Sequence, residues 1–208
     1  NTPIHNGNLI RKPACDFGWD WNIALATFGV YGDLHLEPAA PSRIDHLVIT
    51  QTHSPGLAVV SVTAEVEGDD GQEVTFDLCG VQAKAVVRRG QAKADLSIAN
   101  PALWWPAGQG AQPLHDLTVT MGAQVLTRRI GLRVAELITE KDAVGLGFKV
   151  RVNGRDIFCK GANWIPADAL AGRINQADTR ALLQSAKDAH MNMIRIWGGG
   201  WYEPTWFY

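Results

Sequence analysis

The chain has 208 residues and a formal net charge of −2, with 46% apolar and 19% charged residues, which is an ordinary globular composition. This charge balance gives no electrostatic footprint for nucleic acid or for an anionic membrane, and no apolar run reaches the roughly 18 residues of a membrane span. The sequence therefore predicts one or two domains without a nucleic-acid or membrane partner.

The three cysteines are Cys15, Cys79 and Cys159, which are too few and too widely spaced for a disulfide framework or a zinc site. We interpret them as isolated thiols that are buried or half-buried, and we predict no metal site. The first ten residues lack the basic and apolar segments of a signal peptide. These observations leave the compartment open between cytoplasm, periplasm and lysosome.

Residues 1–37 consist of short apolar segments broken by turns. Residues 23–28 and 30–36 have the composition or alternation of strands, but 37 residues cannot bury a core by themselves. We therefore interpret this stretch as the end of a larger β-domain. Pro38-Ala39-Ala40-Pro41 is a stiff connector that marks a boundary.

Residues 38–137 predict an immunoglobulin-like β-sandwich. About seven short segments alternate between apolar and polar residues at spacings typical of such a sandwich. They are residues 43–51, 57–66, 74–78, 83–88, 92–98, 114–121 and 123–132. The long loop at residues 100–110 carries Trp104 and Trp105 between prolines and glycines, so its two indoles either pack between domains or contact a ligand.

From Phe148 onward the pattern changes to a hairpin of residues 148–152 and 157–160, whose second strand leads through a loop and a helix to another strand. Asn153-Gly154 is a strong hairpin signal, and residues 161–166 are predicted as a loop that leaves a strand. Asn175 is a suitable N-cap for a helix over residues 176–191, and residues 193–197 form an apolar strand. This βα unit needs further parallel strands, so we expect the sequence to be cut inside a third domain.

The segment Phe17-Gly18-Trp19-Asp20-Trp21 places one carboxylate between two indoles. We interpret it as a sugar-binding loop, in which Trp19 packs on the apolar sugar face and Asp20 accepts charge-assisted hydrogen bonds from hydroxyls. The alternative is that Asp20 caps its own loop through backbone amides. Trp21 is interpreted as an indole that holds the loop. Lys12 and Arg11 either neutralise Asp20 or bind a neighbouring domain.

Four segments resemble, in the family's order, the β-mannosidases of glycoside hydrolase family 2. The first is the Trp19-Asp20-Trp21 loop after Arg11-Lys12, and the second is Leu103-Trp104-Trp105-Pro106 followed by the sequence RRIGLRVAEL. The third is KGANWIP at residues 160–166, and the fourth is NMIRIWGGG at residues 192–200. The chain departs from the family at Asn22-Ile23, where glycine and proline are usual, and at Gly32, where arginine is usual.

The resemblance implies a mainly β chain of three parts. Residues 1–37 would be the C-terminal part of a jelly-roll sugar-binding domain, residues 38–137 the immunoglobulin-like sandwich, and residues 138–208 the start of a truncated (β/α)₈ TIM barrel. Active sites of such barrels lie at the C-terminal ends of the strands.

The resemblance also implies the substrate-binding residues. It makes Arg195 a ligand for sugar hydroxyls and Trp197 a wall of the subsite, beside Trp19 and Asp20. Asn163 and Trp164 follow the first barrel strand, so they either line the site or pack. The alternative for Arg195 and Trp197 is a place in the barrel core.

No catalytic carboxylate is assigned within the chain. The resembled family uses two glutamates on later barrel strands, and Glu136, Glu140 and Glu203 match neither position. We expect the residues that break the bond to lie beyond residue 208, and we expect no metal or other cofactor.

The favoured function is therefore part of an exo-acting, retaining β-mannosidase that hydrolyses terminal non-reducing β-D-mannose from an oligosaccharide or mannoside. One alternative is another family 2 glycosidase, an exo-β-glucosaminidase or a β-glucuronidase. The other is a non-catalytic carbohydrate-binding β-sandwich module, against which the βα unit argues. The oligomeric state and the natural oligosaccharide stay open.

Overall fold

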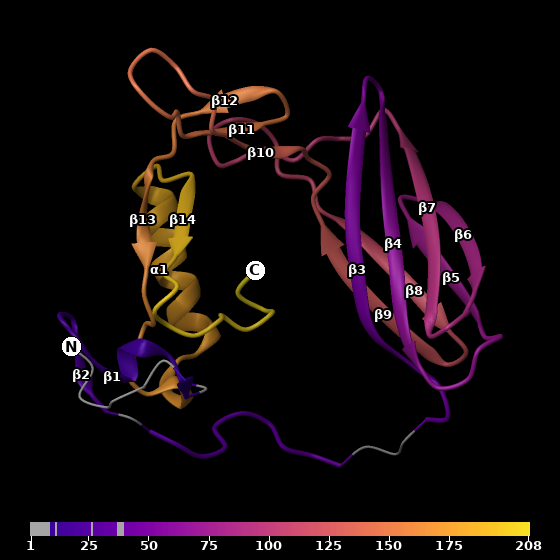
Figure 1. Ribbon diagram of the computed structural model, residues 1–208, viewed down its shortest axis with the longest axis horizontal. Coiled ribbons are helices and arrows are strands. Elements are labelled where there is room, and N and C mark those ends of the chain that lie inside the picture. Colours follow the sequence, from indigo (N-terminus) through magenta and orange to yellow (C-terminus); the bar gives the residue numbers. More distant parts are fainter. Residues whose placement is uncertain (1–8, 11, 26, 37–39) are drawn as a thin grey trace. The chain divides into compact units, whose positions relative to one another are not determined.

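The computed structural model describes residues 9, 10, 12–25, 27–36 and 40–208 (Figure 1). The chain forms two compact units. One unit is discontinuous and combines Asn1–Glu37 with Cys159–Tyr208, and the other is Pro38–Phe158. The two units are described separately.

The unit Pro38–Phe158 is dominated by a sandwich of two antiparallel sheets. One sheet has the order β3-β4-β7 and the other has the order β6-β5-β8-β9, so β5 and β8 are interior strands. The strands are β3 (Arg43–Ser54), β4 (Leu57–Glu67), β5 (Glu73–Leu78), β6 (Val81–Val86), β7 (Gln91–Ala99), β8 (His115–Met121) and β9 (Gln124–Ile130). These are the seven strands that the alternating segments predict.

The core of this unit lies between the two sheets. Strand β4 alternates strictly between buried and half-buried residues, as expected when one face of a strand packs against a core and the other faces outward. Val60 and Val62 of β4 and Leu96 of β7 belong to the same buried cluster as Phe76 of β5 and Val119 of β8. Apolar side chains from both sheets therefore form a single core.

Trp104 and Trp105 pack inside the unit Pro38–Phe158. The guanidinium carbon of Arg133 lies 4.6 Å from the Trp104 ring centroid, and that of Arg155 lies 4.7 Å from the Trp105 ring centroid. The side-chain amide of Asn153 also donates a hydrogen bond to the Trp104 carbonyl, at 3.0 Å. Cation–π contacts of this kind favour the packing interpretation of the loop.

A smaller antiparallel sheet follows the sandwich in sequence and consists of β10 (Ala135–Ile138), β11 (Lys149–Val152) and β12 (Arg155–Ile157). Asn153 and Gly154 form the two-residue turn between β11 and β12, with φ angles of +49° and +78°. Both angles lie in the left-handed region, where asparagine and glycine are tolerated best. The predicted hairpin is confirmed.

The discontinuous unit contains one antiparallel hairpin and one parallel strand pair. The hairpin is β1 (Phe17–Trp19) with β2 (Asn22–Ala24), preceded by the 3₁₀ helix η2 (Ala14–Asp16). The parallel pair is β13 (Gly161–Trp164) with β14 (Met193–Ile196), connected through the 3₁₀ helix η3 (Ala171–Arg173) and helix α1 (Gln176–Asp188). A βα unit is therefore present, with β13 as its first strand in place of the predicted residues 157–160, whereas closure into a barrel stays a prediction.

Helix α1 begins where the sequence predicts. The Asn175 side chain accepts a hydrogen bond from the Asp178 backbone N–H at 2.9 Å, which satisfies one of the free N–H groups of the first turn. The helix ends at Asp188, three residues earlier than the pattern suggests.

One loop prediction and one strand prediction are wrong, and another strand prediction is right only in part. Residues 161–164, predicted as a loop, form strand β13, because Gly161 has no side chain and lets the Met193 carbonyl approach. A Cβ atom at Gly161 would lie 1.8 Å from that oxygen. Residues 30–36, predicted as a strand, pair with no described strand, and of residues 23–28 only the beginning belongs to β2. Alternation alone does not make a strand when the backbone finds no partner.

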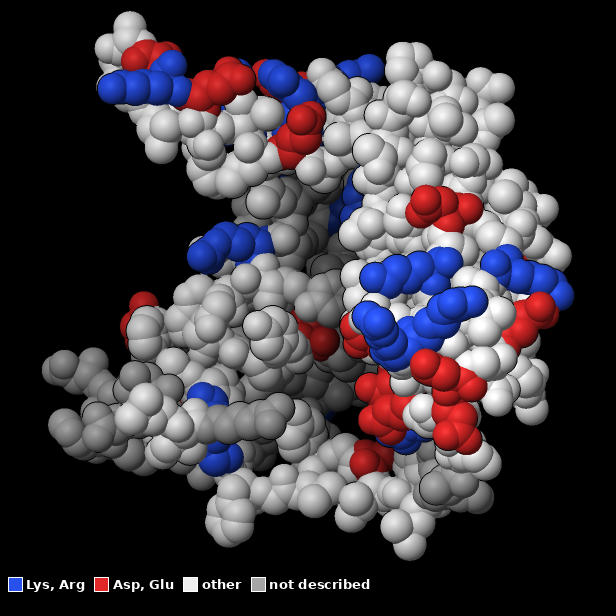
Figure 2. Space-filling view, turned by 45° about the vertical axis from the view of Figure 1, so that its right-hand side comes forward, with Lys and Arg blue, Asp and Glu red and all other residues white. Residues whose placement is uncertain are grey.

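Acidic and basic side chains are interspersed on the face drawn in Figure 2. Exposed ion pairs join Lys84 to Glu73, at 2.7 Å, and Arg43 to Glu67, at 2.8 Å. Such surface pairs each contribute at most about 1 kcal/mol. Within the described ranges, no helix has the length and the apolar character needed to cross a membrane.

We predict that Phe76→Ala lowers the free energy of unfolding of the unit Pro38–Phe158 by about 3–5 kcal/mol, because the phenyl ring is fully buried on an interior strand. Native-state hydrogen exchange of the β5 and β8 amides measures the free energy of unfolding of this unit. The control is Val125→Ala on β9, where the side chain is exposed and the expected change is within about 0.5 kcal/mol. Equal effects of the two changes would contradict this description of the core.

Candidate functional site

The hairpin β1–β2 presents two of the residues that sequence analysis selects. Trp19 pairs with Asn22, so Asp20 and Trp21 form the two-residue turn between the strands. Gly18 has a φ angle of +97°, a conformation that residues with a side chain rarely adopt. A glycine before the two indoles is therefore a requirement of the backbone.

Backbone hydrogen bonds attach the base of this hairpin to the loop after β14. The Cys15 N–H donates to the Gly199 carbonyl at 3.1 Å, and the Leu25 N–H donates to the Asp16 carbonyl at 2.9 Å. The Asn22 side-chain amide donates to the Cys15 carbonyl, also at 2.9 Å. The first of these bonds joins the hairpin to the loop after β14, and the other two hold the hairpin and its preceding 3₁₀ helix together.

Trp197 contacts the indoles on both sides of Asp20. Its ring centroid lies 5.2 Å from that of Trp19, with a tilted geometry, and 5.8 Å from that of Trp21, with an edge-on geometry. Aromatic pairs prefer such arrangements to face-to-face stacking. The structure thus brings Trp197 and Trp19 together, and Trp21 joins the same cluster.

Two of the three glycines after Trp197 are required because other atoms come too close for a side chain. A Cβ atom at Gly199 would lie 2.1 Å from the Trp197 ring, and one at Gly200 would lie 2.8 Å from the Pro166 ring. Neither glycine has a positive φ angle, whereas Gly198 has open space around it. Gly199 therefore leaves room for the indole of Trp197.

Arg195 and Asn163 form a second group on the neighbouring strands. The two residues are paired in the parallel register of β13 and β14, and Arg195 Nη1 donates to Asn163 Oδ1 at 3.1 Å. Both side chains are exposed, so the guanidinium keeps further donors for a ligand. The role of Arg195 in sugar binding stays a prediction.

Trp164 is half-buried and has three contacts. Its Nε1 donates to Glu203 Oε1 at 2.8 Å, and its ring centroid lies 5.2 Å from that of Phe207. Its backbone carbonyl accepts from the Trp197 N–H at 2.9 Å. The arrangement therefore makes Trp164 an anchor of the loop that begins at Trp197.

Asp20 is exposed, and no described residue forms a hydrogen bond or ion pair with its carboxylate. Its side chain therefore does not cap the turn through the described backbone amides. The ammonium of Lys12 donates instead to the Thr27 carbonyl. Arg11, the other predicted partner of Asp20, lies outside the described residues.

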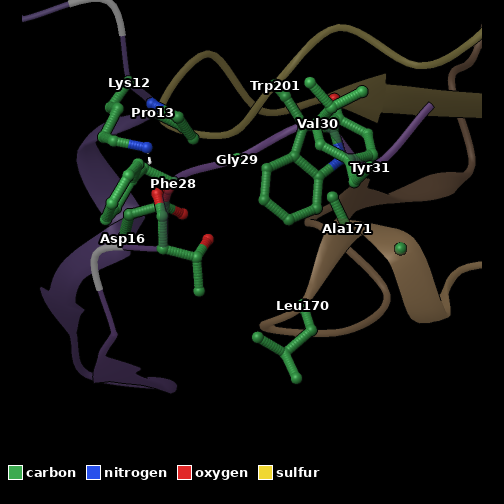
Figure 3. A pocket seen from close by; sticks show the side chains of 12 residues that line it. Lys12, Pro13, Asp16, Phe28, Gly29, Val30, Tyr31, Leu170, Ala171 and Trp201 are labelled. Carbon is green, nitrogen blue, oxygen red and sulfur yellow. Dashed lines mark hydrogen bonds between the residues drawn. The ribbon is translucent and has the colours of Figure 1, made fainter. Parts of the chain in front are cut away.

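A cavity of about 370 Å³ lies beside the base of the hairpin (Figure 3). Lys12 and Asp16 occupy one side of it, and Tyr31 and Trp201 occupy the other. Burial raises the pKa of the Asp16 carboxyl above its ordinary value, and the positive charge of Lys12 acts in the opposite direction. The cavity offers a carboxylate, a cation and aromatic rings, which are groups that bind polar ring compounds.

Sequence reasoning did not select Asp16, and it considered Glu203 only as a catalytic candidate. Both are buried carboxylates within the discontinuous unit. Their only signal in the sequence is an acidic residue among aromatic neighbours, which does not say that the side chain is buried. Among the residues that the structure describes, no group of three or more His, Cys, Asp or Glu side chains could hold a metal ion.

Comparisons with known proteins show which family this chain resembles. Residues 42–133 match the family model of glycosyl hydrolases family 2. The chain is 35% identical to β-mannosidase B of Aspergillus niger and 32% identical to β-mannosidase of Capra hircus, over 96% and 99% of its length. The crystal structure of β-D-mannosidase from Dictyoglomus thermophilum superimposes with a TM-score of 0.86 and 34% identity, over 95% of the chain. The resemblance to family 2 β-mannosidases is confirmed.

The chain spans about a quarter of these relatives, which is 25% and 26% of the two sequences and 26% of the solved structure. Exo-chitosanase CsxA of Amycolatopsis orientalis also superimposes, with a TM-score of 0.60 and 22% identity over 80% of the chain. At this identity the likeness concerns the fold alone.

We predict that Gly199→Ala displaces the Trp197 indole, because the new methyl group would overlap the ring. Near-UV circular dichroism, which reports on fixed packing of aromatic side chains, should lose part of the tryptophan signal. Gly198→Ala is the matched control, since a Cβ atom there meets no neighbour within 4 Å. Indistinguishable spectra for the two variants would contradict the placement of Trp197.

Proposed function

We propose that the chain is part of an exo-acting, retaining β-mannosidase that hydrolyses terminal non-reducing β-D-mannose residues of an oligosaccharide or mannoside. The proposal rests mainly on one juxtaposition. The Asp20 turn, with its flanking indoles, lies against Trp197 in the loop that directly follows the strand of Arg195. Relatives named β-mannosidase, at 32–36% identity over most of the chain, support this choice of sugar.

The groups at this site match the needs of a pyranose ring. Indole faces of Trp19 and Trp197 would pack against the C–H surface of the sugar, and Trp19 is 49% exposed. The Asp20 carboxylate would accept hydrogen bonds from two hydroxyl groups, and the Arg195 guanidinium, held by Asn163, would donate to others. Trp164 would support this arrangement from the neighbouring strand.

The bond-breaking step needs two carboxyl groups about 5–5.5 Å apart, one as acid/base and one as nucleophile. We assign neither to this chain. Glu203 is engaged by the Trp164 indole, and Glu136 and Glu140 belong to the other compact unit. We infer that both catalytic glutamates lie in the part of the protein outside residues 1–208. The chemistry requires no metal or organic cofactor.

The proposed domain frame follows from the same resemblance. Residues 1–37 would complete a jelly-roll sugar-binding domain, and residues 38–137 would be an immunoglobulin-like sandwich, in agreement with the family match at residues 42–133. Residues 138–208 would begin a (β/α)₈ barrel, and the parallel pair β13–β14 with helix α1 supports this assignment.

Substrate choice is tested with a panel of aryl β-glycosides and the full-length protein. We expect hydrolysis of the β-mannoside, with retention of configuration at the anomeric carbon. Hydrolysis of the β-glucosaminide or β-glucuronide without the β-mannoside would overturn the proposed specificity. Binding without hydrolysis of any glycoside would indicate a non-catalytic module.

We predict that Asp20→Ala in the full-length protein lowers kcat/KM for the aryl β-mannoside at least tenfold. Charge-assisted contacts that strengthen toward the transition state contribute about 1.5–3 kcal/mol. Asp95→Ala is a matched control, because Asp95 is an exposed aspartate on β7 of the sandwich. Steady-state kinetics at a single pH measure the effect. If kcat/KM of Asp20→Ala equals that of the control, Asp20 has no role in sugar binding.

A further inference from the structure

Glu203 is a buried carboxylate in the loop that follows strand β14. Only 7% of the residue is exposed, and a buried carboxylate is costly unless hydrogen bonds compensate for its lost hydration. The indole Nε1 of Trp164 donates to its Oε1 at 2.8 Å, a charge-assisted bond. The donor is the neutral indole of Trp164 on strand β13, so Glu203 is placed to orient that ring.

Trp164 in turn connects both ends of the same loop. Its carbonyl accepts the Trp197 N–H at 2.9 Å at the beginning of the loop, and its ring contacts Phe207 near the end, at 5.2 Å between centroids. Glu203 lies between these two points and adds the third attachment. Trp164 therefore holds the loop from Trp197 to Phe207 at three points, in addition to the contacts of Trp197 and Gly199 with the hairpin.

The residues proposed to bind sugar are direct neighbours of these attachments. Asn163, which accepts from Arg195, precedes Trp164 in β13, and Trp197 follows β14 by one residue. A change in the position of Trp164 would therefore move the backbone beside both Arg195 and Trp197. Binding geometry is sensitive to shifts of this kind.

We propose that Glu203 is a positioning residue that fixes the Trp164 indole and, through it, the loop carrying Trp197. This inference rests on the proposed function, because it concerns the same sugar-binding site. Glu203 needs only to accept the indole hydrogen bond for this role. It acts through Trp164 and takes no part in bond breaking.

The test uses the full-length protein with Glu203→Leu, Glu203→Gln, Trp164→Phe and the Glu203→Leu/Trp164→Phe double variant. Glu203→Leu removes the acceptor at similar volume, whereas Glu203→Gln keeps an oxygen that can accept the same bond. Trp164→Phe keeps a ring and removes the donor. KM and kcat are measured with an aryl β-mannoside, and near-UV circular dichroism is recorded for the two Glu203 variants, which leave every tryptophan in place.

We expect Glu203→Leu and Trp164→Phe each to raise KM about tenfold with kcat within about threefold, because a displaced binding wall weakens substrate and transition state alike. The double variant should have the same KM as either single variant, since both single changes remove the same hydrogen bond. Glu203→Gln should restore KM to within about threefold of the unmodified protein. Glu136→Leu, at an exposed glutamate on β10, is the control for the loss of a carboxylate.

Two results would overturn the proposal. One is an unchanged KM for Glu203→Leu, and the other is an equal loss in Glu203→Gln and Glu203→Leu, which would make the charge itself the important property. If Glu203→Leu does not fold, Glu203→Gln and Trp164→Phe still provide the comparison. If the unmodified protein does not hydrolyse the mannoside, the proposed function fails, while the difference in circular dichroism between the Glu203 variants still tests the positioning role.

Discussion

The candidate site depends on the contact of the Trp197 indole with Trp19 and Trp21. This contact joins a hairpin near the beginning of the chain to a loop near its end, and the Cys15–Gly199 backbone hydrogen bond fixes their relative position. Both segments are too short to bury a core alone, and each supplies the apolar surface that the other lacks. The indoles on both sides of Asp20 are held in place by this contact.

Close packing of backbone explains why glycine occurs at several decisive positions. A side chain at Gly161 would collide with the Met193 carbonyl, and one at Gly199 would collide with the Trp197 ring. Gly161 leaves room for a residue that is distant in sequence and Gly199 for one that lies two positions before it, whereas Gly18 is required by its own φ angle. The same residue type therefore answers two different physical needs within one unit.

Local signals predict much of the fold. Alternation of apolar residues gives the seven sandwich strands, Asn153-Gly154 gives a hairpin, and Asn175 gives the start of helix α1, because each signal is complete within a few residues. The local sequence does not predict strand β13, because this strand forms by pairing with β14, about thirty residues away. The segment at residues 30–36 shows the opposite case. Its residues alternate as in a strand, but it pairs with no described strand.

The site was predictable in part for the same reason. Motif resemblance selected Trp19, Asp20, Arg195 and Trp197, and the structure brings Trp19 and Trp197 into contact. The Trp164–Glu203 bond and the burial of Asp16 could not be derived, because hydrogen-bond partners and burial depend on chain crossings that leave no local pattern. The roles of the site residues in binding sugar stay predictions.

The discontinuous unit also has a consequence for synthesis on the ribosome. The sandwich between its two segments is continuous in sequence, so it can fold as soon as residue 158 has emerged. The hairpin gains its hydrogen bond to the Gly199 carbonyl only after Gly199 has been synthesised, roughly 180 residues after Cys15. This delay corresponds to roughly 10–40 s at usual elongation rates. During that interval Trp19 and Trp21 lack their partner indole, so the aromatic surface that Trp197 later contacts is without this neighbour.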